Sequence, residues 1–545
     1  MKKGLPNLLR IVPLFALAAF LSCARVRYEP PVSDPIIRVG ILEGQENIYF
    51  EPQGPFRVQA SVAKENLQLN EPGLWSAVVA EVTPGQKHYR ILLFESASEA
   101  RAKETAQRMK AREVPVEIKP FGEVLRIDNK TLVDRRYFRV LLDKTFDTQM
   151  SADLYFKTST ALANARVVEE WERPGGGVIK LLSPSGKEYS VHDRLRLLGS
   201  GVALKNVQVG TGYHWEHQES RSYAGELELG VDNAGRLNVI NVVNLEAYLR
   251  GVVAGEMPSN FPAEALKAQA MVSRTLFMNN FYRFHRGADY DVCDEVHCQV
   301  YVGLSQQNEN ASSAVASTRG MVLTYGDQLC TATYSAVCGG HTADAAEVWE
   351  GDGQPYLRGE FDSIESGIGR NALDLTKEEN ARLWVASSPK VNCNIQSAGR
   401  PSFAQYAEKY FRWQTTATRQ DLQKWIVEKT GVEIGDLRDI VPLRRGASGR
   451  LAEILIVGSR DSVTVTRELN IRRTLSSSAL YSACFVIDKV NERNGLAEAF
   501  RFTGAGWGHG VGMCQVGASI RALRGQNAAT ILSAYYPGTR LKKIY

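Results

Sequence analysis

The chain has 545 residues, of which 44% are hydrophobic and 23% charged, and its formal net charge is +5. This composition is typical of globular protein, and the length predicts roughly three domains. Lysine and arginine are spread along the chain, and no basic run alternates with aromatic residues, which argues against nucleic-acid binding.

The first 22 residues are predicted to be an export signal. Basic residues precede an apolar run at 11–21, which is too short to span a bilayer comfortably. Cys23 follows and resembles the lipidation site of bacterial lipoproteins, although Phe20 stands where leucine is usual. Acylation of Cys23 would tether the exported protein to a membrane surface, with residues 23–35 as anchor and proline-containing linker. The alternative is secretion with cleavage nearby.

A strand expected at 36–42 opens a segment, 36–75, that we assign to the main domain. Residues 76–175 are predicted to form a separate α+β module, because strand and helix patterns follow in βαββαβ order. The expected strands are 89–94, 114–118, 137–142 and 165–171, and the expected helices are 96–112 and 148–163.

Two segments of this module carry a resemblance. They are Tyr89-Arg-Ile with Phe94-Glu-Ser-Ala-Ser-Glu-Ala-Arg101, and Tyr137-Phe-Arg-Val140. Together with the layout they resemble the SPOR domain, a small peptidoglycan-binding module. The resemblance implies binding to glycan strands stripped of stem peptides; the alternative is an insert without a ligand.

Strand-like segments dominate residues 176–545, so the main domain is expected to be mostly β with a few helices, within the α+β class. The strands are expected at 178–182, 225–231, 237–243, 320–325, 451–457 and 462–465, and the helices at 262–280, 306–317, 418–430 and 528–535.

The segment ending in Glu256-Met-Pro258 is apolar and is expected to form a tight turn bounded by glycine and proline. Its carboxyl group should lose solvation and keep its proton near neutral pH, which suits a general acid. Lys267 and Arg274 lie seven residues apart and share one face of the following helix. They could bind an anionic or polyhydroxyl substrate, or the set could be a buried ion pair; the pattern favours neither.

Cysteine and histidine are concentrated at His285, Cys293, His297 and Cys298, which form a plausible tetrahedral zinc set. The alternative is a Cys293–Cys298 disulfide. Cys338-Gly-Gly-His341 could supply another ligand or form only a tight turn. Seven cysteines follow Cys23, so intramolecular disulfides cannot pair them all.

Near the C-terminus, five glycines between 504 and 512 permit close approach of a ligand to the backbone. Trp507, His509 and Gln515 suit stacking and hydrogen bonding to a sugar. The alternative is a demanding turn in which His509 is a core residue.

Four motifs in order resemble the SpoIID/LytB family, named for stage II sporulation protein D. They are Glu256-Met-Pro with Phe261-Pro-Ala-Glu-Ala-Leu-Lys-Ala-Gln-Ala270 and Arg274-Thr275; Cys293-Asp-Glu-Val-His-Cys-Gln-Val-Tyr301; Ser335-Ala-Val-Cys-Gly-Gly-His-Thr342; and Gly506-Trp-Gly-His-Gly-Val-Gly-Met-Cys-Gln-Val-Gly-Ala518. The resemblance covers 36 to about 60 and 176–545.

The resemblance implies lytic transglycosylase activity on denuded peptidoglycan, cutting between N-acetylmuramic acid and N-acetylglucosamine and leaving 1,6-anhydro ends. It assigns the acid/base role to Glu256 and the cleft cations to Lys267 and Arg274. Zinc, reported in some members, would fall on the His285 to Cys298 set; no organic cofactor is expected. Cys514 stands where the family commonly has serine.

A single carboxylate is sufficient for such chemistry, because attack by the muramic acid 6-hydroxyl replaces an external nucleophile. Asp291, Asp294 and Glu295 are expected to be solvated or to orient ligands. Some relatives are amidase enhancers, so the alternative function is a non-catalytic wall-binding protein that activates an amidase. Either function would serve wall remodelling in sporulation, division or general growth.

Overall fold

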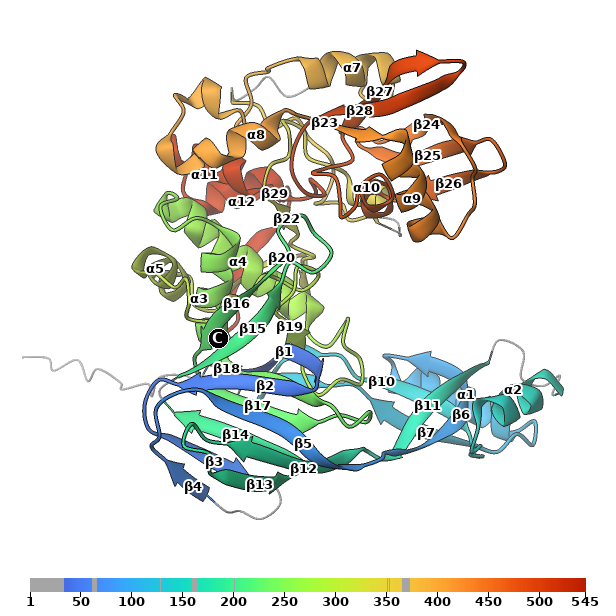
Figure 1. Cartoon of the computed structure of the whole chain (residues 1–545), viewed down its shortest axis with the longest axis vertical. Helices are drawn as coiled ribbons and strands as arrows, with labels where there is room; N and C mark the ends of the chain where they lie inside the picture. Colours follow the sequence, from blue (N-terminus) through green and yellow to red (C-terminus); the bar gives the residue numbers. More distant parts are fainter. Residues whose placement is uncertain are drawn as a thin grey trace, which may run out of the picture. The chain divides into compact units, whose positions relative to one another are not determined.

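The computed structural model describes residues 34–60, 66–127, 129–158, 165–199, 201–349, 351, 353–364 and 373–545 (Figure 1). The expected signal peptide, Cys23 and most of the linker lie outside these ranges. Among the helices described, none is long and apolar enough to cross a membrane.

Two sheets share the main hydrophobic core. One has the order β19 (Val292–Cys293), β1 (Ile36–Gln45), β18 (Leu237–Asn244), β17 (Glu226–Val231), β14 (Arg194–Gly199), β3 (Phe56–Ala60) and β4 (Asn66–Leu69). The other has the order β13 (Glu188–His192), β12 (Gly176–Leu182), β5 (Trp75–Thr83), β2 (Asn47–Pro52), β15 (Val202–Val209) and β16 (His217–Tyr223). Alternate residues such as Val39 and Phe50 are fully buried in this core. The α+β class is confirmed.

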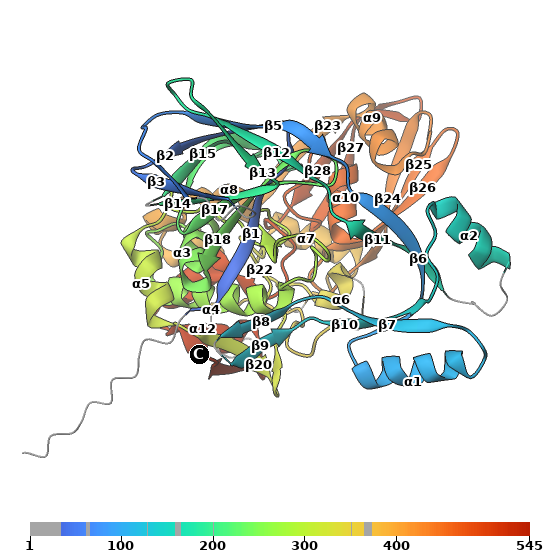
Figure 2. The ribbon, with the colours of Figure 1, turned by 90° about the horizontal axis from the view of Figure 1, so that it is seen from below.

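The inserted module has the expected βαββαβ order. Its antiparallel sheet runs β11 (Arg166–Arg173), β6 (Gln86–Ser96), β10 (Tyr137–Leu142) and β7 (Val116–Phe121), with helices α1 (Glu99–Lys110) and α2 (Gln149–Thr158). A hairpin, β8 (Val124–Ile127) and β9 (Lys130–Asp134), is added between β7 and β10. This hairpin lies beside β20 (Met321–Tyr325) and its partner β30 (Arg540–Lys543) (Figure 2). Lys130 Nζ, at the start of β9, donates to the carbonyl of Ile544, which follows β30, at 2.5 Å.

The module leaves the core between two paired strands. β5 and β12 are antiparallel neighbours in the six-stranded sheet, with Thr83 opposite Gly176. The expected boundary at 76–175 therefore includes a core strand, and the module itself spans β6 to β11. Its ends lie close together, as an insertion requires.

A group of helices packs around α4 (Ala263–Asn280), which contacts α3 (Leu245–Glu256), α5 (Glu309–Ser317), α11 (Gln515–Leu523) and α12 (Ala528–Tyr535) (Figure 1). α3 replaces the turn that we expected before Met257. The Asn244 side chain caps it by accepting from the Ala247 N–H at 2.7 Å. Gly251 permits close packing here, because a Cβ would lie 2.6 Å from the Tyr301 ring.

Residues 413–504 contribute two three-stranded sheets with their own core. Their orders are β23 (Trp413–Thr418), β28 (Leu496–Gly504), β27 (Phe485–Arg493) and β24 (Leu437–Arg445), β25 (Leu451–Gly458), β26 (Ser462–Thr466). The expected helix at 418–430 is α9 (Arg419–Thr430), whereas α7 (Glu378–Ala386), α10 (Glu468–Thr474) and α11 were not expected.

Candidate functional site

Glu256 ends α3, and polar groups of neighbouring segments surround it. Its Oε1 accepts the Val300 N–H at 2.9 Å, and its carbonyl accepts from Gln515 Nε2 at 3.0 Å. The residue is half-buried, and burial raises the pKa of its carboxyl above the usual value. Hydrogen bonds from the Val300 N–H and the Tyr334 and Gln515 side chains only partly oppose this effect. The fold therefore favours the protonated acid.

A polar network behind Glu256 fixes these partners. Gln515 Nε2 also contacts Gln269 Oε1 at 3.3 Å, and Gln269 donates to Ser273 Oγ at 3.0 Å. The Tyr334 hydroxyl donates to Gln299 Oε1 at 3.1 Å, and Gln299 donates to the Ser273 carbonyl at 3.2 Å. Sequence reasoning missed Gln269, Ser273, Gln299 and Tyr334. The signal for two of them was present, since Gln269 and Ser273 are polar residues one turn apart on a buried helix.

Gln515, expected to bind substrate, is 5% exposed and has its amide engaged by Glu256 and Gln269. It positions the end of α3 and does not face a ligand.

The glycine-rich loop is brought to this network by a short strand pair. β22 (Tyr334–Ser335) runs parallel to β29 (Met513–Cys514), and Val337 bridges to Trp507. His509 lies in this loop and its Nδ1 accepts the Val511 N–H at 3.0 Å. Burial, together with Arg450 and Arg472, lowers the pKa of His509 to about 3. The imidazole is therefore neutral, and it also hydrogen-bonds to the Tyr334 backbone.

Trp507 is half-buried in an aromatic cluster. Its ring stacks on Tyr410 with centroids 4.2 Å apart, and Trp215 meets it edge-on at 5.7 Å. Trp215 comes from the tip of the β15–β16 hairpin and stacks on Tyr213. Nothing in the sequence indicated that Trp215, almost 300 residues before Trp507, would contact it.

Lys267 is partly exposed on α4 but is not adjacent to Glu256. Its Nζ pairs with Glu264 at 2.7 Å, and each side chain is about one-third exposed. The side chain lines a hollow of about 280 Å³ between α4 and α5, together with Phe261 and Asn310. Glu256 is not part of this lining.

Arg274 corrects a prediction. It is fully buried, and its Nε and Nη2 donate to the two carboxylate oxygens of Glu246 at 2.8 and 2.7 Å. Its Nη1 donates to the Met321 carbonyl at 3.1 Å. No part of the guanidinium faces solvent, so Arg274 does not bind substrate in this structure. The ion-pair alternative holds for this residue, with Glu246 and not Glu256 as partner.

The four predicted metal ligands converge. Their donor atoms all lie within 4.8 Å of one another. His285 Nε2 is 3.2 Å from His297 Nε2 and 3.3 Å from Cys298 Sγ, and His297 Nε2 is 3.5 Å from Cys293 Sγ. Bond lengths of about 2.1 Å to nitrogen and 2.3 Å to sulfur predict tetrahedral separations of about 3.4 to 3.8 Å, close to these distances. The donor set therefore fits Zn²⁺. Both cysteines are free thiols, so the alternative disulfide is absent from this structure.

The Cys338-Gly-Gly-His341 turn supplies nothing to that set. His341 Nδ1 contacts the Thr342 carbonyl at 2.8 Å, and Cys338 belongs to a separate cluster with Cys393 and Cys514. Asp291 and Asp294 are not solvated: both are buried, and Asp294 lies 3.3 Å from Arg221.

Comparison with known proteins agrees with the motifs. Residues 233–325 match the family model described as stage II sporulation protein, SpoIID, and residues 343–512 match a domain of unknown function, DUF8618. The chain is 29% identical over 318 residues to the amidase enhancer of Bacillus subtilis, covering 54% of this chain and 40% of that protein.

For two other relatives, the match covers a larger share of the relative's own length. An uncharacterized protein of Brachyspira hyodysenteriae is 32% identical over 301 residues, covering 55% of this chain and 67% of that protein. Stage II sporulation protein D of Bacillus subtilis is 27% identical over 317 residues, covering 55% of this chain and 75% of the relative. The chain belongs to the SpoIID/LytB family.

Proposed function

We propose that the protein is a lytic transglycosylase of the bacterial cell wall. It would cleave the MurNAc–GlcNAc bond in peptidoglycan strands lacking stem peptides and leave 1,6-anhydroMurNAc ends. The observation that carries this proposal is the Glu256 carboxyl, half-buried with a raised pKa and held by the Val300 N–H at 2.9 Å. The relatives named for sporulation and amidase enhancement support a role in wall remodelling.

The chemistry needs one acid that becomes a base. Glu256 donates its proton to the bridging glycosidic oxygen as the bond to the MurNAc anomeric carbon breaks. The resulting carboxylate then accepts the proton of the MurNAc 6-hydroxyl, whose oxygen bonds to that carbon. The proton returns to Glu256 and no water is consumed. The raised pKa of this carboxyl favours the protonated form that starts the cycle.

Three other side chains expected from the sequence suit a carbohydrate. The half-buried Trp507 ring, backed by Tyr410, offers an apolar face to a sugar ring. His509, in the same loop as Trp507, remains a proposed sugar contact. Lys267, farther along α4, suits the lactyl carboxylate of a neighbouring MurNAc residue.

Zinc held by His285, Cys293, His297 and Cys298 would supply a rigid cross-link for the segment that ends at Val300. The cross-linked segment would then hold the Val300 N–H against the Glu256 carboxyl. The metal is proposed as a structural element.

The alternative, an amidase enhancer without its own activity, rests on the name of one relative. The two functions separate when purified protein is incubated with amidase-treated sacculi and the soluble products are analysed by mass spectrometry. We expect anhydromuramyl products from the wild type and from the exposed control Glu309→Gln, and almost none from Glu256→Gln. Absence of products from the wild type would leave only the binding function, and equal release by Glu256→Gln would contradict the catalytic role of Glu256.

We further propose that the inserted module binds denuded glycan as a SPOR-like domain and that the exported protein is anchored through Cys23. Because Thr83 and Gly176 are cross-strand partners, residues 84–175 can be replaced by a short turn without disturbing the core sheet. The shortened protein should lose sacculus pull-down while still cleaving short soluble glycans. Unchanged pull-down would contradict the SPOR assignment.

A further inference from the structure

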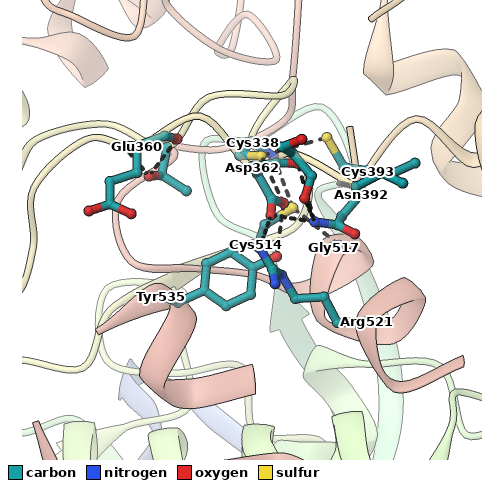
Figure 3. A network of polar contacts seen from close by, with 12 residues as sticks. Cys338, Glu360, Asp362, Asn392, Cys393, Cys514, Gly517, Arg521 and Tyr535 are labelled. Atoms are coloured by element: carbon teal, nitrogen blue, oxygen red, sulfur yellow. Dashed lines mark hydrogen bonds and ion pairs between the residues drawn. The ribbon is translucent and has the colours of Figure 1, made fainter. Parts of the chain in front are cut away.

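A second cluster of sulfur ligands lies apart from the one that the sequence indicated. Cys338 follows β22, Cys393 precedes the 3-10 helix Ile395–Ala398, and Cys514 ends β29. All three are buried, with at most 2% of each residue exposed. Their Sγ atoms lie within 4.8 Å of one another, and those of Cys338 and Cys393 are 3.6 Å apart. Figure 3 shows the three side chains gathered around Asp362.

Backbone N–H groups point at two of these sulfur atoms. Cys514 Sγ accepts from the N–H groups of Cys338 at 3.2 Å and Gly517 at 3.3 Å. Cys338 Sγ accepts from the Gly340 N–H at 3.4 Å. A neutral thiol is a weak acceptor, whereas donors of this kind stabilise thiolates and orient metal ligands.

The Asp362 carboxylate lies beside Cys338 at the edge of this cluster. Its side chain is 1% exposed, and its Oδ2 lies 3.9 Å from Cys338 Sγ. Arg521 and Asn392 donate to Oδ1 at 2.8 and 2.7 Å, and the Tyr535 hydroxyl donates to Oδ2 at 2.9 Å (Figure 3). These partners fix the carboxylate and offset part of the negative charge.

We propose that Cys338, Cys393 and Cys514 form a second zinc-type site, with three thiolates as ligands and the buried Asp362 carboxylate beside Cys338. Tetrahedral bonds of about 2.3 Å to sulfur predict sulfur–sulfur separations of about 3.8 Å. The Cys338 and Cys393 sulfur atoms are 3.6 Å apart, close to this value. A metal satisfies all three sulfur atoms at once, whereas a disulfide would use two and leave the third. The site joins segments on both sides of residues 343–512 and fixes the start of α11, next to Gln515.

The test is the metal content of the full chain, purified without chelators and measured by plasma mass spectrometry. Cys393→Ser should contain one equivalent of zinc less than the wild type, and Cys293→Ser should independently lose one from the first site. Cys330→Ser, which removes a buried thiol outside both clusters, should lose none. Equal zinc content in Cys393→Ser and the wild type would overturn the proposal.

X-ray absorption of the zinc-loaded wild type needs no variant, so it still tests the proposal if Cys393→Ser does not fold. Two sites of these compositions predict more than two sulfur neighbours per zinc on average, whereas the first site alone predicts two. An average of two, or a Cys338–Cys393 disulfide found by peptide mapping of the native protein, would also overturn the proposal. Neither readout depends on catalytic activity.

Discussion

Removing the Arg274 guanidinium should destabilise the fold without removing a substrate contact. The group is fully buried and makes hydrogen bonds of 2.8 and 2.7 Å to Glu246 and 3.1 Å to the Met321 carbonyl. Its loss leaves the Glu246 carboxylate buried without a counter-ion, with the Tyr545 hydroxyl as a remaining donor. Breaking one side of such a pair costs about 3–5 kcal/mol, and we expect Arg274→Met to lower the free energy of unfolding by that amount.

The assay is urea unfolding followed by circular dichroism, with Glu246→Gln and the double variant completing a thermodynamic cycle. The double variant should lose less stability than the two single losses combined, because neither charge is then left alone. Lys267→Met is the matched control, since it lies on the same helix but is partly exposed. The reasoning would be refuted if Arg274→Met stayed within about 0.5 kcal/mol of the wild type yet lost binding to denuded glycan.

Four other outcomes follow from the site. Glu256→Gln should gain stability relative to the wild type as pH rises above about 4.5, because the raised pKa makes ionisation of Glu256 unfavourable in the fold; equal pH profiles in thermal melts would contradict this. Conversely, acidification from about pH 6.5 towards 3 should destabilise the wild type more than His509→Gln, because only the unfolded chain protonates His509 in that range, and the same melts measure it. Lys267→Ala should change the free energy of unfolding by less than about 0.5 kcal/mol, since its ion pair is exposed, but weaken glycan binding in a pull-down. Chelation should lower the midpoint of thermal unfolding in the wild type more than in His297→Ala, and added zinc should raise it by more in the wild type, because His297→Ala lacks the first site.

Local signals predicted much of the fold. The helix expected at 262–280 is α4, which starts after Pro262, and the helix expected at 418–430 is α9, where Thr418 caps the first turn by accepting from the Asp421 N–H at 3.1 Å. The βαββαβ succession of elements in the inserted module followed from strand and helix patterns in the same way. α3 was missed because Gly251 and Gly255 read as turn residues, although Gly251 serves close packing against Tyr301.

The site residues also differ in whether local sequence could predict them. His285, Cys293, His297 and Cys298 lie within fourteen residues, so their chemistry was visible in the sequence. Cys338 and Cys514 are 176 residues apart, and only the fold brings them together. For Lys267 and Arg274, helical spacing predicted a shared stripe but not which side chain is exposed. That outcome depends on Glu246, which lies 28 residues from Arg274.

The most direct test of the central claim is the fate of water during cleavage. Amidase-treated glycan is digested by the wild-type protein in ¹⁸O-labelled water, and the new MurNAc ends are analysed by mass spectrometry. Intramolecular attack by the 6-hydroxyl predicts ends lighter than reducing ends by one water molecule and free of ¹⁸O. Ends that carry ¹⁸O and a free reducing group would contradict a transglycosylase in which Glu256 acts as the lone acid and base.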